Sequence, residues 1–344
     1  NGLKFYDSNG YKLPDEVEDE LEKYVRQSAD NELARPTGNG IGKIEFNSNL
    51  AHLYAHFVRH TIDTSLEGLT IVYDGANGAA SSVGPEILSG LGAKVININV
   101  NPDGLNINHH CGSTHIEGLQ VAVQQHNADL GIANDGDADR CLLVDEKGQV
   151  LDGDQIMLLC ALKLKEEGKL KGDTIVGTVM SNIGFHKAAE ELGMKTVSTA
   201  VGDRYVLEYM REHNLSIGGE QSGHVIFLDH NTTGDGMLTA VQVAALMKEK
   251  KQPLSELAGI MTKYPQVLVN VRVATKTGWE DNDLIKAAIV TAEGELGDEG
   301  RVLVRASGTE PLIRVMAEGP DQETLQSLCE EIADIIGREQ GLAE

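Results

Sequence analysis

Three aspartates stand at alternate positions of one short segment and could bind a metal ion. Asp135, Asp137 and Asp139 lie in the string Asp-Gly-Asp-Ala-Asp-Arg, between two apolar runs that read as strands. Carboxylates at alternate positions of a tight turn can direct their oxygens at one hard cation such as Mg²⁺. A solvated acidic turn is the plainer alternative. A calcium loop of the EF-hand type is excluded, because Arg140 occupies the sixth position, where that loop needs glycine.

A second polar segment could bind a sugar. Glu220 and Ser222 lie in the string Gly-Gly-Glu-Gln-Ser-Gly-His, which ends at His224 and has apolar residues on both sides. A carboxylate and a hydroxyl two residues apart can together recognise neighbouring sugar hydroxyls. A glycine-rich hairpin with a surface histidine is an equally reasonable interpretation of this string alone.

Arginines and hydroxyl residues gather around a further glycine, where they could bind a phosphate. The string Arg-Ala-Ser-Gly-Thr-Glu-Pro begins at Arg305, and another arginine follows it closely. Guanidinium groups, hydroxyls and exposed amides are the donors that suit a phosphate monoester. The candidate ligands are Arg305, Ser307, Gly308, Thr309 and Arg314. A plain polar turn is the less favoured alternative.

A fourth candidate segment opens a predicted helix. Thr199 is followed by Gly202, Asp203 and Arg204, so helix-start amides and a guanidinium could receive an anion. In the alternative interpretation, Asp203 serves only as the N-cap of that helix.

The elements around these segments predict an α/β protein of several domains. Short apolar strands alternate with helices in two successive rounds, which favours largely parallel sheets covered by helices. The strands of these rounds are expected at 69–73, 94–98, 129–133, 174–178 and 195–198. The helices are expected up to about 91 and at 117–126, 154–167, 183–192 and 204–212.

The order of elements differs at both ends of the chain. Helices are expected behind Pro14, with apolar residues recurring to Val25, and from about 47 to 62. After residue 265 the pattern predicts a smaller α+β unit with strands at 267–273, 301–305 and 312–317 and helices at 283–292 and 321–337. The predicted domains are 1–63 (the end of a first domain), 64–152 (metal loop), 153–263 (sugar loop) and 264–344 (phosphate loop).

Charge and cysteine content exclude several classes of partner. Lys and Arg number 29 against 53 Asp and Glu, a formal net charge of −24, so the surface repels nucleic acid and anionic membranes and argues against both as partners. No apolar run approaches the roughly 20 residues that a membrane span needs, and no secretory signal is visible. The four cysteines are scattered without a Cys-x-x-Cys pair, which favours a reducing cytoplasm.

Together, the four segments resemble the α-D-phosphohexomutase family. The strings Asp-Gly-Asp-x-Asp-Arg, Gly-Glu-x-Ser-Gly-His and Arg-x-Ser-Gly-Thr-Glu-Pro occur in the family's order. The segment Asn-Pro-Asp-Gly-Leu-Asn-Ile-Asn from Asn101, with Cys-Gly-Ser-Thr-His from Cys111, is most similar to members that act on an amino sugar. The resemblance covers essentially the whole chain.

The resemblance implies a fold, a reaction and residue roles. It implies three related α/β domains, the first truncated here, and a smaller C-terminal α+β domain around a central cleft. The reaction would interconvert glucosamine 6-phosphate and glucosamine 1-phosphate through a phosphoserine and glucosamine 1,6-bisphosphate, for UDP-N-acetylglucosamine and cell-wall precursor synthesis. Rival interpretations are a mutase of plain hexose phosphates and a noncatalytic phosphosugar-binding protein.

By the same resemblance, each segment receives a part of the chemistry. The aspartate trio would hold Mg²⁺, Glu220 and Ser222 the sugar hydroxyls, and the loop around Ser307 the nonreacting phosphate. Arg140 would approach the transferred phosphoryl group, and Lys4 and His224 are candidates for moving the hydroxyl proton. The full-length protein is a candidate homodimer.

One departure from the family concerns the nucleophile. Family members carry a serine in a Thr/Ser-Ala-Ser-His-Asn-Pro string just before the segment that matches Asn-Gly-Leu-Lys at residues 1–4, and no such string occurs in this chain. We therefore expect the part with the catalytic serine to lie upstream of this sequence, and the chain alone to be inactive.

Overall fold

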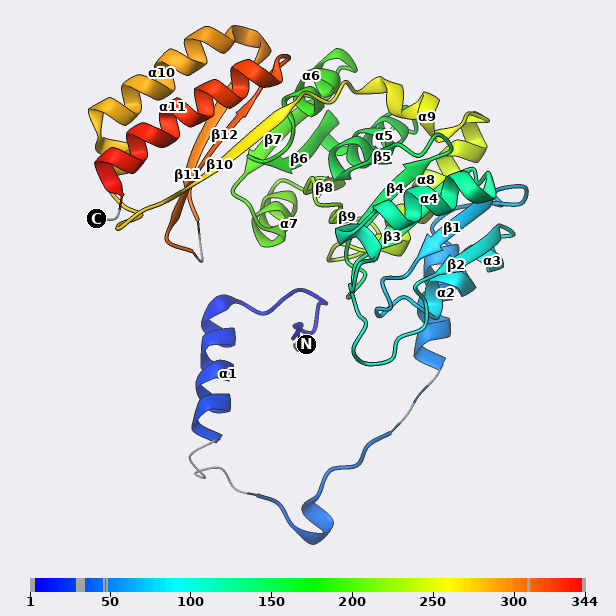
Figure 1. The fold of residues 1–344 in the computed structure, drawn as a ribbon. Helices are drawn as coiled ribbons and strands as arrows, with labels where there is room; N and C mark the ends of the chain where they lie inside the picture. Colours follow the sequence, from blue (N-terminus) through cyan, green and yellow to red (C-terminus); the bar gives the residue numbers. More distant parts are fainter. Residues whose placement is uncertain (1–3, 29–34, 46, 48, 308–309, 342–344) are drawn as a thin grey trace. The chain divides into compact units, whose positions relative to one another are not determined.

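The computed structural model describes residues 4–28, 35–45, 47, 49–307 and 310–341 (Figure 1). The chain divides into two compact units. Unit 1 contains Asn1–Val150 and His224–Lys251, and unit 2 contains Leu151–Gly223 and Gln252–Glu344.

A sheet with helices on both faces forms the centre of unit 1. Its strands follow the order β2 (Lys94–Ile98), β1 (Thr70–Asp74), β3 (Leu130–Asn134) and β4 (Cys141–Asp145). Strand β1 is parallel to β2 and β3, whereas β4 returns antiparallel to β3. The short strands β5 (Val150–Leu151) and β9 (Val225–Phe227) stand where the chain passes between the units.

The two faces of this sheet receive different helices. Helix α4 (Glu117–His126) buries Leu119 and Val123 against Val72. Tyr73, the next residue of β1, points to the other face, where its ring lies against Gly84 of α3 (Val83–Gly90). Helix α8 (Gly236–Lys250) contacts β3 and β4 and is buried over most of its length. The loop between β3 and β4 is therefore attached to two strands that are packed between helices.

Two further helices precede the sheet in unit 1. Helix α2 (Asn49–Arg59) buries Ala55 and Val58, and Gln242 of α8 donates to the Thr61 carbonyl at 3.2 Å. Helix α1 (Asp15–Ser28) leaves Val25 70% exposed, so it contributes little to the described core (Figure 1).

Unit 2 contains a parallel sheet followed by an antiparallel one. Strands β7 (Lys195–Thr199), β6 (Thr174–Thr178) and β8 (Ile217–Gly219) are parallel in that order. The helices of this part are α5 (Gly153–Glu166), α6 (Ile183–Glu191), α7 (Asp203–Glu212) and α9 (Leu254–Leu257).

The last part of unit 2 is the smaller α+β layer. Strands β10 (Gln266–Arg272), β12 (Leu312–Glu318) and β11 (Arg301–Ala306) are antiparallel in that order. Helices α10 (Asp283–Leu296) and α11 (Gln322–Gln340) lie side by side on one face, around a core that includes Ile313, Val315 and Ile332 (Figure 1). Short 3₁₀ turns occupy Gly38–Gly40, Gly112–Thr114, Lys171–Asp173, Ala258–Ile260, Trp279–Asp281 and Gly297–Glu299.

The α/β prediction is confirmed, but the sequence analysis did not identify two helices of the described residues, α8 and the short α9. Helix α8 has buried residues on all its sides, so it lacks the polar stripe that marks a surface helix. Some helix ends also differ from the expectation, since α2 ends at Arg59, α10 continues to Leu296 and α11 continues to Gln340. Within the described ranges, no helix is both long and apolar enough to cross a membrane.

Candidate functional site

The aspartate trio lies on the loop that joins β3 to β4, where the chain reverses direction. One carboxylate oxygen from each of Asp135, Asp137 and Asp139 lies within 4.8 Å of the others. Ala138 adopts φ = +62° between two of them, and this left-handed residue turns the chain sharply. The convergence expected from the alternate spacing is therefore present, and the group can hold a metal ion.

The pKa values of Asp135 and Asp137 are shifted in opposite directions. Burial, together with the charges of Asp139 and Asp137, raises the pKa of Asp135 to about 6. Partial burial favours the neutral form of Asp137, but its hydrogen bonds with Lys4 and Asp135 and the charge of Lys4 together outweigh burial and lower the pKa of that carboxyl. The trio thus concentrates negative charge that a cation would stabilise.

Lys4 places an ammonium group among these carboxylates. Its Nζ donates to Asp137 Oδ2 at 2.7 Å and to Asp139 Oδ2 at 3.2 Å. Although burial alone would lower the pKa of Lys4, its bonds to the two carboxylates raise it above its ordinary value. Lys4 is therefore a protonated donor here, and its ammonium shows that the trio accepts a cation. Oxygen ligands of this kind suit Mg²⁺.

Arg140 and His224 also lie beside the trio. Arg140 Nε is 3.9 Å from Asp135 Oδ2 and 4.0 Å from Asp139 Oδ1. His224 Nε2 is 3.9 Å from Asp139 Oδ2, and the residue is only 3% exposed. The alternative of a surface histidine is therefore wrong. The proton-transfer roles of Lys4 and His224 stay a prediction.

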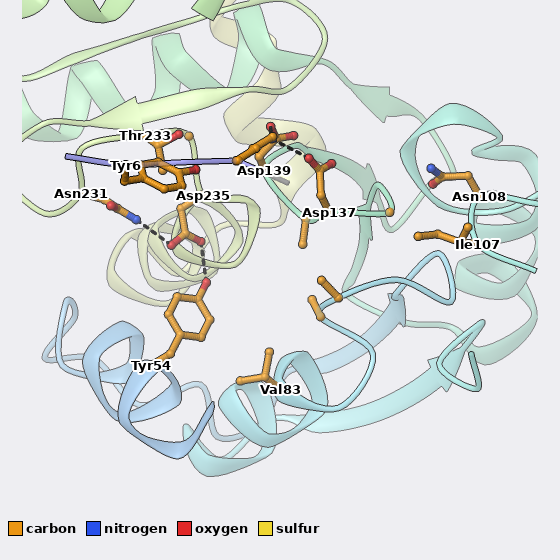
Figure 2. Close-up of a pocket in the computed structure, with 16 residues that line it drawn as sticks. Tyr6, Tyr54, Val83, Ile107, Asn108, Asp137, Asp139, Asn231, Thr233 and Asp235 are labelled. Atoms are coloured by element: carbon orange, nitrogen blue, oxygen red, sulfur yellow. Dashed lines mark hydrogen bonds and ion pairs between the residues drawn. The ribbon is translucent and has the colours of Figure 1, made fainter. Parts of the chain in front are cut away.

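A cavity of about 790 Å³ opens over the metal loop (Figure 2). Its lining includes Lys4, Asp137 and Asp139, together with residues that the sequence analysis missed. Figure 2 shows Tyr54 of α2 directed at Asp235, to whose Oδ1 it donates at 2.7 Å. Asp235 also caps α8 by accepting from Leu238 N at 2.9 Å. The Gly-Asp-Gly string before α8 is the signal that could have identified Asp235.

The predicted sugar loop and the start of α7 meet in unit 2. The backbone N–H of Gly202 donates to Glu220 Oε1 at 3.0 Å. Helix α7 begins at Asp203 with Gly202 at its N-cap and no side-chain cap, so Asp203 is not the N-cap. Arg204 Nε donates to Glu208 Oε1 at 2.8 Å.

The other polar residues of these segments stay near the surface. Thr199 Oγ1 donates to the Gly177 carbonyl at 3.2 Å, and Ser222 is exposed. Of the two predicted sugar ligands, Glu220 is the one whose carboxylate is held by another segment, through the Gly202 N–H.

The predicted phosphate loop joins β11 to β12 and brings two guanidinium groups together. Arg305 and Arg314 are directly opposite in the antiparallel register, so their side chains share one face. Burial and the charge of Arg314 lower the pKa of Arg305. Like charges facing each other destabilise a sheet unless an anion lies between them. This pair therefore favours an anion.

Contacts within the loop hold its two ends. Ser307 is buried, and its Oγ accepts from Glu310 N at 3.3 Å. Lys276 Nζ, which the sequence analysis did not identify, donates to the Ser307 carbonyl at 2.8 Å. Arg314 Nη2 donates to Glu310 Oε2 at 3.1 Å, while its buried Nε has no partner among the described residues. The predicted ligands Gly308 and Thr309 lie outside the described residues.

Family models match most of the chain. They are those of phosphoglucomutase/phosphomannomutase α/β/α domain II over residues 50–148, α/β/α domain III over 152–264 and the C-terminal domain over 268–335. The domain limits expected from the sequence, at 64, 153 and 264, stay a prediction.

Curated relatives are similar over nearly the whole chain. A phosphoglucosamine mutase from Symbiobacterium thermophilum is 55% identical over 341 residues, which are 98% of this chain and 75% of the relative. One from Geobacillus thermodenitrificans is 51% identical over 342 residues, 99% of this chain and 76% of the relative. About a quarter of each relative lies outside the match.

Solved structures show the same fold at lower identity. A phosphoglucomutase/phosphomannomutase family protein from Burkholderia thailandensis superposes with a TM-score of 0.74 at 21% identity, covering 93% of this chain and 70% of that chain. N-acetylphosphoglucosamine mutase from Aspergillus fumigatus, in complex with GlcNAc-6P and magnesium, gives 0.68 at 22% identity, covering 86% of this chain and 67% of that chain.

Proposed function

The chain belongs to the phosphoglucomutase/phosphomannomutase family, and on this premise we propose that it is the metal-, sugar- and phosphate-binding part of a phosphoglucosamine mutase. The full-length enzyme would be an isomerase that converts glucosamine 6-phosphate into glucosamine 1-phosphate and back. The observation that carries this proposal is 55% identity to a phosphoglucosamine mutase over 98% of the chain. The product would supply UDP-N-acetylglucosamine and cell-wall precursor synthesis.

The metal loop would act on the phosphoryl group that moves. Asp135, Asp137 and Asp139 would hold Mg²⁺, a proposal that rests on their convergence and on the Lys4 ammonium bonded to two of them. When bound, Mg²⁺ neutralises charge on the oxygens of the transferring group. Arg140, beside the trio, would add a second positive charge for the same oxygens.

Two other segments would bind the parts of the substrate that do not react. Glu220 and Ser222 would bind sugar hydroxyls, with the start of α7 (Thr199 and Gly202 to Arg204) beside them. The opposed Arg305 and Arg314, with the loop between them, would bind the nonreacting phosphate, because two guanidinium groups on one face suit a dianion.

The covalent steps would need the serine that this chain does not contain. A phosphoserine would transfer its phosphoryl group to the 1-hydroxyl of glucosamine 6-phosphate, which gives glucosamine 1,6-bisphosphate and a free serine. The serine would then take the phosphoryl group from the 6-position, which leaves glucosamine 1-phosphate and restores the phosphoserine. Lys4 and His224 are the proposed carriers of the hydroxyl proton, since both lie beside the trio.

Location and assembly belong to the same proposal. A cytoplasmic enzyme is supported by the four cysteines, which are buried thiols and form no disulfide. A homodimer of the full-length enzyme is proposed from the family resemblance alone.

Binding measurements on the 344-residue chain test the proposal without requiring turnover. Calorimetric titration with glucosamine 6-phosphate and mannose 6-phosphate, each with Mg²⁺, should give tighter binding of the amino sugar. Equal or tighter binding of the plain hexose phosphate would favour a phosphomannomutase or phosphoglucomutase instead. Absence of binding by a folded chain would contradict the phosphosugar assignment.

A further inference from the structure

Asn134, the last residue of β3, closes the metal loop at its base. Its side chain is fully buried, and both ends of its amide are bonded. Nδ2 donates to the Arg140 carbonyl at 2.7 Å, and Oδ1 accepts from the Tyr73 hydroxyl at 3.0 Å. Because Asn134 pairs with Cys141 in the strand register, this bond joins the two ends of the six-residue loop.

Gly236, the first residue of α8, touches the same loop from another element. Its N–H donates to the Ala138 carbonyl at 2.9 Å. A Cβ at this position would overlap the Arg140 carbonyl oxygen and Asn134 Nδ2, the two atoms joined by the bond just described. Only glycine allows the start of α8 to approach the loop this closely.

Ala138, whose carbonyl accepts the hydrogen bond from Gly236, has a strained backbone conformation. Ala138 has φ = +62°, a conformation that costs a residue with a Cβ roughly 1–2 kcal/mol. Such a conformation persists only where surrounding contacts fix it. Ala138 lies between Asp137 and Asp139, so its backbone sets the direction of both carboxylates.

The backbone carbonyls of the even-numbered loop residues are all held by groups outside the loop. The carbonyls of Ala138 and Arg140 are bonded to Gly236 and Asn134, and that of Gly136 accepts from Ala79 N at 2.8 Å. Groups outside the loop thus hold the carbonyls of its even-numbered residues, and within the loop the Asp135 carbonyl accepts from Ala138 N at 3.1 Å. The odd-numbered aspartates supply the converging carboxylates.

We propose that Asn134 and Gly236 are positioning residues for the metal ion. Neither supplies a ligand. They hold the loop so that three mutually repelling carboxylates converge before any cation arrives, which removes part of the ordering cost from metal binding. The inference rests on the proposed metal site, since it concerns the geometry of the same three ligands.

The first test compares two glycine substitutions in unit 1. Gly236→Ala introduces the overlap with Arg140 and Asn134, whereas Gly118→Ala in α4 places a methyl group where nothing lies within 4 Å. The dissociation constant of Mn²⁺ is measured by electron paramagnetic resonance on the 344-residue chain. We expect Gly236→Ala to weaken Mn²⁺ binding about 10- to 100-fold, as loss of ligand-orienting contacts does. The Gly118→Ala control should stay within about twofold of the unchanged chain.

A rescue experiment separates positioning from general damage. Glycine adopts positive φ freely, so adding Ala138→Gly to Gly236→Ala should recover part of the lost affinity. A nonspecific loss of packing would not respond to this second change, and absence of any recovery would count against the proposal. If Gly236→Ala prevents folding, Asn134→Ala takes its place, and the same 10- to 100-fold loss is expected with far-ultraviolet circular dichroism unchanged.

Substitution of one of the proposed metal ligands tests the metal site separately from the positioning role of Asn134 and Gly236. Asp137→Asn should remove most Mn²⁺ binding. If Asp137→Asn binds Mn²⁺ like the unchanged chain, the metal site is wrong and the positioning role fails with it. If Asp137→Asn loses binding while Gly236→Ala and Asn134→Ala keep it, the metal site stands and the positioning role is overturned.

Discussion

The ammonium of Lys4 lies 2.7 Å from the carboxylate of Asp137, one of the three aspartates that could hold a metal ion. The two residues are 133 positions apart in the sequence, so the fold alone brings them together. The positive charge of the lysine repels a divalent cation at the same carboxylates. We therefore expect the ammonium of Lys4 to compete with metal binding.

Removing the lysine should strengthen metal binding. In a Lys4→Gln variant the trio keeps its three carboxylates but loses the competing positive charge, so we expect Mn²⁺ to bind several-fold more tightly. A titration followed by electron paramagnetic resonance measures this directly, with Lys12→Gln as a matched control outside the metal loop. Weaker binding by Lys4→Gln would show that the lysine supports the site instead of competing for it.

Removing Arg314 should weaken phosphosugar binding by about 10- to 100-fold. One charge-assisted contact contributes about 1.5–3 kcal/mol, which corresponds to that change in the dissociation constant. Calorimetry with glucosamine 6-phosphate compares Arg314→Ala with Arg338→Ala on the exposed side of α11. Because Arg305 and Arg314 face each other, the ligand-free Arg314→Ala variant should be no less stable than the unchanged chain. If Arg314→Ala binds glucosamine 6-phosphate as tightly as the unchanged chain, the phosphate does not bind at Arg314.

The stability of unit 2 should depend on pH through Asp154. Burial, with a smaller contribution from Asp152, raises the pKa of this carboxyl to about 7 from an ordinary value of 3.8. Between pH 4 and 7 the folded state then holds a proton that the unfolded state has lost, so the free energy of unfolding falls as pH rises. The slope from this group is at most about 1.4 kcal/mol per pH unit.

Urea unfolding at a series of pH values tests this assignment. The Asp154→Asn variant should lose the decline between pH 4 and 7, because its side chain does not titrate and keeps an oxygen for the Asn182 N–H. The same decline in the variant would assign the pH dependence to another group.

Features formed by residues close together in the sequence could be predicted from short sequence motifs. The spacing of Asp135, Asp137 and Asp139 is sufficient for convergence on one turn, and the two arginines of the phosphate loop are close in sequence. The alternation of strands and helices likewise follows from short apolar patterns.

Contacts between distant segments could not be predicted in this way. Tyr54 and Asp235 are 181 residues apart, and no pattern around Tyr54 marks it as part of a cavity. Helix α8 is buried on all sides, so its sequence shows no amphipathic period, and the approach of Gly236 to the metal loop depends on where that helix packs. Both features exist only in the folded chain.

Substrate preference of the catalytically complete protein tests the central claim most directly. The 344 residues, joined to a segment that carries the serine loop, are assayed with a bisphosphate activator on glucosamine 6-phosphate and on mannose 6-phosphate, beside the 344-residue chain alone. The account predicts a kcat/KM at least about 10-fold higher for the amino sugar, because an unpaired polar group in a binding site is penalised strongly, and no turnover by the 344 residues alone. Preference for mannose 6-phosphate, or turnover by the 344 residues alone, would contradict it.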